Sequence, residues 1–189
     1  MFHSVHLPLA SGTTRATLLA AVAVAALLVS SASDANARTR RVVEHNADGS
    51  TTARTGVARA APGGRGVLRG RSVTTDGQGH GNVRSGAAVV GPNGATAVRQ
   101  GQSARNADGT ASHSSSIAAQ GDRGTLQSTG AATRSADGSV TQGRTTTATS
   151  AATGNSVQTN STYNPDTGLN RSATCFDASG AAMSCPARP

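Results

Sequence analysis

The two cysteines are the residues whose spacing most directly predicts a covalent bond. Cys175 and Cys185 lie ten positions apart, on either side of the turn-forming sequence Asp177-Ala178-Ser179-Gly180. In an exported chain an even pair of cysteines is typical of a disulfide, whereas their wide spacing and the lack of a nearby histidine argue against a metal or redox pair. We therefore expect a disulfide-closed hairpin that contributes about 2–3 kcal/mol to stability.

The basic residues are all arginine and outnumber the acidic ones, 17 to 9, so the net charge is +8. Such an excess favours polyanionic partners, namely anionic polysaccharide, lipid or nucleic acid, although solubility together with a biased composition would also account for it. Residues 63–71 interleave glycine with arginine, as nucleic-acid-binding segments do and as a flexible linker with scattered arginine also would. The arginines that we expect to act together as a diffuse polyanion-binding set are Arg65, Arg69, Arg71, Arg84, Arg99 and Arg105.

No motif in the chain predicts an enzyme. His45, His80 and His113 stand far apart in the sequence, and nucleophile-elbow, Walker, zincin and dinucleotide-binding motifs are absent. Nearly all carboxylates sit in or next to predicted turns, where an Asp accepts hydrogen bonds from backbone amides two residues on. The glycine-rich nonapeptide that binds calcium in some secreted repeats is also missing. We expect no catalytic residue, metal, cofactor or small-molecule substrate.

The first 37 residues have the pattern of a secretory signal peptide. Arg15 precedes the apolar run 16–29, and the small-residue sequence Ala35-Asn36-Ala37 precedes Arg38. The alternative is a retained membrane anchor, because residues 16–32 are at the short edge of what crosses a bilayer. The pattern predicts an exported protein that is periplasmic, cell-surface or extracellular.

Turn sequences punctuate the remaining chain. Ala-Asp-Gly followed by a hydroxyl residue occurs at 47–50, 107–110 and 136–139, and Asp-Gly is a strong signal for a β-hairpin. The arms between turns alternate weakly. Residues 110–120 place Ala111, His113, Ser115, Ile117 and Ala119 on one face, and residues 139–149 place Thr and Ser opposite Val140, Gln142 and Arg144. Helical spacing of apolar residues is absent after the signal segment.

Large apolar side chains are too few for a conventional core. Residues 38–189 contain 11 Val, 3 Leu, 1 Ile and 1 Phe, so order must come from backbone ladders and small side chains. We predict a mostly β fold, a turn-punctuated antiparallel meander or stacked-hairpin repeat with substantial disorder after a helical signal segment. The alternative is a largely disordered chain. The expected divisions are 1–37 signal peptide, 38–71 basic flexible linker, 72–170 β-hairpin repeat region and 171–189 disulfide-closed hairpin and tail.

These observations predict a non-enzymatic, exported structural or surface protein. Its β-repeats would present arginine and hydroxyl side chains to polyanions, or would associate with other copies of the chain. The alternative function is that of an intrinsically disordered secreted spacer or matrix segment.

Overall fold

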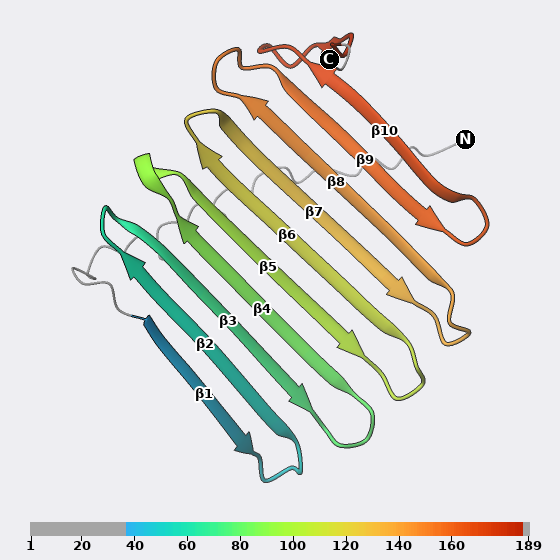
Figure 1. Cartoon of the computed structure of the whole chain (residues 1–189). Helices are drawn as coiled ribbons and strands as arrows, with labels where there is room; N and C mark the ends of the chain where they lie inside the picture. Colours follow the sequence, from blue (N-terminus) through green and yellow to red (C-terminus); the bar gives the residue numbers. More distant parts are fainter. Residues whose placement is uncertain (1–36, 187–189) are drawn as a thin grey trace, which may run out of the picture.

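A computed structural model describes residues 37–186, and these residues form one open antiparallel sheet of eleven strands whose spatial order follows the sequence (Figure 1). The prediction of a mostly β meander is therefore confirmed. Apart from Ala37, the predicted signal segment lies outside the described residues. No helix among residues 37–186 is long and apolar enough to cross a membrane. The strands are β1 (Ala37–His45), β2 (Thr51–Ala61), β3 (Arg65–Thr75), β4 (Gly81–Val90), β5 (Thr96–Arg105), β6 (Ala111–Gly121), β7 (Gly124–Arg134), β8 (Val140–Ser150), β9 (Ser156–Asn164), β10 (Gly168–Phe176) and β11 (Ala182–Met183), with a short 3-10 turn η1 (Pro92–Gly94) between β4 and β5.

The Ala-Asp-Gly sequences form tight connections along one rim of the sheet. After β1, β5 and β7 the Asp side chain accepts a hydrogen bond of 2.9 Å from the backbone amide two residues on. The following glycines have φ of 80° at Gly49, 86° at Gly109 and 90° at Gly138, a region that glycine adopts at little cost. A backbone hydrogen bond then closes each loop, as between the Asn106 amide and the Thr110 carbonyl at 2.9 Å. Each motif thus specifies a reversal of the chain.

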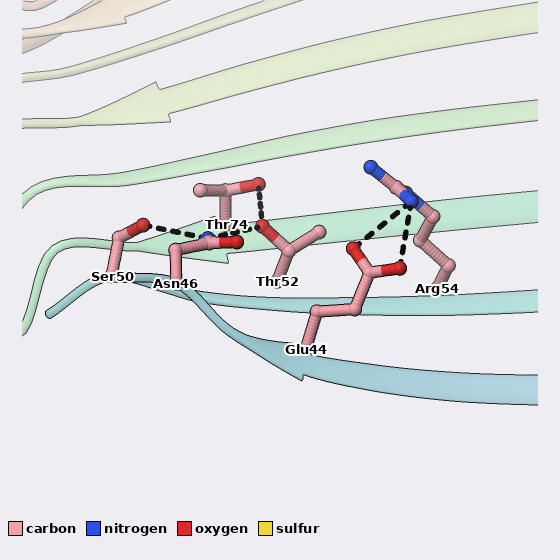
Figure 2. A network of polar contacts seen from close by, with 6 residues as sticks. All are labelled: Glu44, Asn46, Ser50, Thr52, Arg54 and Thr74. Carbon is pink, nitrogen blue, oxygen red and sulfur yellow. Dashed lines mark hydrogen bonds and ion pairs between the residues drawn. The ribbon is translucent and has the colours of Figure 1, made fainter. Parts of the chain in front are cut away.

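The described residues contain almost no hydrophobic core. Backbone ladders and small polar side chains hold the sheet together instead. Cys175 is the one hydrophobic side chain among them that is buried. Hydroxyl pairs join neighbouring strands, with oxygen separations of 3.2 Å for Thr52–Thr74 (Figure 2) and 2.8 Å for Ser128–Thr146. Such cross-strand pairs contribute a few tenths of a kcal/mol to about 1 kcal/mol each. The expectation that order comes from ladders and small side chains matches this arrangement.

The segment 38–71, which the sequence predicts to be a basic flexible linker, differs from that expectation because it forms β1, β2 and most of β3. The glycines of this segment do not interrupt the strands. Gly56 and Gly70 face each other in the register of β2 and β3, and Gly63 and Gly64 form the turn between these strands with positive φ. Valine and threonine in the same segment favour a pleated surface. Glycine therefore supplies the turn here rather than a flexible region.

The C-terminal cysteines form the predicted disulfide. Cys175 in β10 is bonded to Cys185, with the two Cα atoms 5.2 Å apart. Asp177 caps the intervening turn through hydrogen bonds from the Ser179 hydroxyl at 2.6 Å and amide at 2.9 Å. Cys175 also pairs in register with Met183 of β11. The hairpin covers the end of the last long strand.

The pairing register separates the strand residues into two chemically different faces. Residues directly opposite each other in an antiparallel pair lie on the same face, and side chains alternate along each strand. We call the face that contains Arg69 the arginine face; it consists of the odd-numbered residues of β1–β6, β9 and β10 and the even-numbered residues of β7 and β8. The other face is called the hydroxyl face.

Candidate polyanion-binding face

Ten strand arginines gather on the arginine face, and all of them are exposed. This face contains no strand carboxylate, so its charges are of one sign. They come from β1, β2, β3, β5, β7, β8 and β10, and the pairing register rather than proximity in the sequence brings them to one face. The ten are Arg41, Arg59, Arg65, Arg69, Arg71, Arg99, Arg105, Arg134, Arg144 and Arg171.

The carboxylates of the described residues lie elsewhere. All seven aspartates of this part of the chain are in the connections between strands, and Glu44 is the remaining acid. The Glu44 carboxylate lies on the hydroxyl face, 3.1 Å from the Arg54 guanidinium of the next strand (Figure 2). Strand arginines on the arginine face thus have no acidic strand neighbour that would neutralise them.

Five of the six predicted binding arginines share this face. Arg69 and Arg71 are alternate residues of β3, about 7 Å apart along the strand. Arg99 is two strands away, because Arg69 pairs with Ala87 and Ala87 pairs with Arg99, which is about 10 Å across the sheet. The other two residues on the same face are Arg65 and Arg105. The register places Arg84 on the hydroxyl face, opposite Gln102.

Arg144, in the middle of β8, holds a fixed position on the arginine face, and it is absent from the binding set predicted from the sequence. Its guanidinium donates hydrogen bonds to Ser128 Oγ at 2.8 Å and to Ser115 Oγ at 2.9 Å, and both serines are buried. The side chain lies over Gly130, where a Cβ atom would come within 3.1 Å of the guanidinium carbon. Glycine at 130 therefore gives the arginine room to span two strands. The register alone would have indicated this contact.

Another feature of the arginine face is a hollow of about 460 Å³, which is lined by Arg105, Arg134 and His113. Arg105 and Arg134 belong to the same cross-strand row, each paired with Ala111 of β6. The nearby His113 Nδ1 is 2.8 Å from Ser103 Oγ, which fixes the ring. His80 lies in the connection after β3 and His45 at the end of β1, so the three histidines do not converge. Among residues 37–186 no group of His, Cys, Asp and Glu is arranged to hold a metal ion.

An apolar row accompanies the arginines at one end of the strands. From β3 to β11 the paired residues of this row are all alanine, valine, leucine, cysteine or methionine, beginning with Val67–Val89 and ending with Cys175–Met183. The C-terminal hairpin borders a hollow of about 920 Å³ at the end of this row. The arginine face is therefore amphipathic, with positive charge beside small apolar side chains.

The turn carboxylates are kept ionised by local hydrogen bonds. The hydroxyls of Ser50, Thr110 and Ser179, and then neighbouring backbone amides, lower the pKa of Asp48, Asp108 and Asp177 below the ordinary value. For Asp137 the Ser139 amide is the larger cause and its hydroxyl the second, and for Asp76 the Gln78 amide lowers the pKa most. These acids therefore stay charged in the connections at the rims of the sheet, outside the strands.

Comparison with known proteins gives no relative from which a role could be transferred: no protein-family model, curated protein or solved structure matches the chain. The chemistry of the arginine face is thus the main guide. A broad array of exposed guanidinium groups on a fixed lattice can form several charge-assisted hydrogen bonds with the acidic groups of one polymer.

Proposed function

We propose that this chain is an exported, non-enzymatic surface protein whose arginine face binds a linear polyanion. The observation that carries the proposal is the segregation of charge by the register, with ten arginines and no carboxylate at the strand positions of one face. A charge array of this kind attracts anionic polymers and holds them through many weak contacts. The disulfide between Cys175 and Cys185 supports an oxidising compartment such as the periplasm, the cell surface or the extracellular space.

Polyanion binding is favoured over self-association through this face. Two copies that stacked arginine face on arginine face would bring like charges together, and like-charge contact at an interface costs several kcal/mol. The open edge strand β1 is also poorly suited to pairing with another copy, because its first half contains Arg38, Arg40 and Arg41, and edge charges oppose strand addition. A polyanion carries the charge opposite to that of the arginines, so its binding incurs neither penalty.

The salt dependence of binding tests this proposal. The purified chain should bind heparin and a short DNA duplex, and the logarithm of each affinity should fall linearly with the logarithm of the salt concentration. A neutral polymer of similar length should not compete for this face. Equal affinity at low and at high salt, or equal competition by the neutral polymer, would refute charge-based binding.

A further inference from the structure

The hydroxyl face contains a long groove that the proposed polyanion site does not use. The groove has a volume of about 950 Å³ and crosses β4 to β9 at right angles to the strands, a distance of about 24 Å at the usual strand spacing. One wall is a cross-strand row of paired residues, and the other is the next row along the strands, from Gln102 to Thr162. The first row consists of Gln100, Ser116, Thr129, Thr145 and Asn160.

Gly143 lies in the second row, between Ala131 and Thr162, and leaves a gap in that wall of the groove. Gly143 belongs to the hydroxyl face, and a Cβ atom built on it would have no other atom within 4 Å. Between the two rows lie the backbones of Gly101 and Gly130, whose missing side chains would have pointed to the arginine face. The Arg144 side chain also lies on that other face, although its backbone forms part of the groove floor. The groove is thus a shallow, backbone-floored channel.

Apart from Ala131, the uncharged side chains around the groove can both donate and accept hydrogen bonds, and no charged side chain lines most of its length. From β5 to β10 no strand residue of the hydroxyl face is Arg, Asp or Glu, and Arg84 lies at the β4 end of the groove. Hydroxyl and amide groups both donate and accept hydrogen bonds. Some are already held in place, since the Thr145 hydroxyl donates to Asn160 Oδ1 at 2.8 Å across β8 and β9. This lining matches a ligand whose own groups are uncharged donors and acceptors.

We propose that the groove on the hydroxyl face binds an uncharged glycan chain. A sugar polymer presents hydroxyl groups that donate and accept in the same way as the Ser, Thr, Asn and Gln side chains, and its narrow extended shape fits a channel that crosses six strands. A polyanion would gain little here, because a single arginine lines the groove from the hydroxyl face. A second copy of the chain would present the same hollow and would touch it only at the margins.

The inference is independent of polyanion binding and gives the sheet two differently specialised faces. The arginine face would hold an acidic polymer and the hydroxyl face a neutral one, so a single layer could connect the two. The charge difference between the faces makes the two sites separately testable. Heparin reports on the arginine face and neutral oligosaccharides report on the groove.

Titration calorimetry with full-length protein and neutral hexasaccharides of β-linked glucose or β-linked N-acetylglucosamine tests the proposal. Gly143→Leu should fill the groove without backbone collision and lower the affinity by about tenfold or more. Gly70→Leu is the matched control, since Gly70 is on the same face in β3, outside the groove, with its nearest atom 3.9 Å from a built Cβ. Thr129→Val, which keeps the β-branched shape, provides a second variant that removes one hydroxyl from the wall.

The expected result is binding of at least one hexasaccharide, weakened by Gly143→Leu and by Thr129→Val but not by Gly70→Leu, with heparin affinity the same throughout. If neither hexasaccharide binds, the proposal is overturned. So would an equal loss in Gly70→Leu. A concentration-dependent dimer that Gly143→Leu abolishes would assign the groove to a second copy of the chain and would likewise overturn it.

Discussion

The arginine face predicts that the position of a lost charge matters more than the number of charges lost. The triple variant Arg69→Gln, Arg71→Gln and Arg99→Gln removes three neighbouring guanidinium groups from that face. The matched control removes three from the other face, at Arg38, Arg40 and Arg84. Both variants lower the net charge of the chain by three. We expect only the first to weaken polyanion binding substantially.

The magnitude follows from the release of counterions. Each phosphate contact with a DNA duplex contributes about 0.9 to the slope of log affinity against log salt. If each of the three arginines makes one contact, the slope becomes shallower by about 2.7. Between about 50 mM and 200 mM salt, the advantage of the wild type over the triple variant should therefore shrink by about 40-fold.

Fluorescence anisotropy with a labelled DNA duplex, repeated at several salt concentrations, measures both slopes. Circular dichroism of each variant checks that the β signal is retained. If the two triple variants lose the same slope, net charge rather than the arginine face governs binding. If neither loses slope, these arginines do not contact the polymer.

Three further predictions concern stability. Gly130→Ala should displace the Arg144 guanidinium and lower the free energy of unfolding by about 1 kcal/mol, whereas Gly143→Ala should raise it by about 0.4–1 kcal/mol. Chemical denaturation of the two variants measures both changes, and the reverse order would contradict the described packing. Cys185→Ser should lower the free energy of unfolding by about 2–3 kcal/mol, and reduction of the wild type should do the same, whereas an unchanged midpoint would mean that the loop adds no constraint. The lowered pKa values of the five turn aspartates confer stability above their ordinary pKa of 3.8, and this stability is lost as the pH falls through the folded-state values. The denaturation midpoint should therefore be steady between about pH 5 and pH 7 and fall below about pH 4, and a midpoint that rises on acidification would contradict the turn hydrogen bonds.

The sequence could predict the turns and the alternation because both are local. Asp-Gly specifies a reversal, and the face assignments for residues 110–120 and 139–149 agree with the register. Arg84 shows where the reasoning stopped short. It is even-numbered in β4, whereas the other five predicted arginines are odd-numbered, and the register from β2 to β6 pairs odd with odd residues. The connections between β2 and β6 each contain an odd number of residues. Counting the alternation of faces onward through them would have placed Arg84 on the other face from the five remaining arginines.

Other features required the three-dimensional register. The residues on the arginine face change from odd-numbered to even-numbered between β6 and β7, and back to odd-numbered between β8 and β9. Arg134 and Arg144 join the arginine face only because of the first change, so a sequence argument based on a single parity misses both. The contact between Arg144 and Ser115 joins residues that are 29 positions apart. Local propensity contains no information about such a contact, nor about a groove whose floor is formed by the backbone of several strands.

Arginine-selective chemical modification, read by mass spectrometry with and without heparin, tests the central claim most directly. Phenylglyoxal should label the exposed arginines of both faces in the free protein. With heparin bound, we expect Arg69, Arg71 and Arg99 to be protected, while Arg38, Arg40 and Arg84 react as in the free protein. Equal protection on both faces, or protection confined to the hydroxyl face, would contradict a dedicated arginine face.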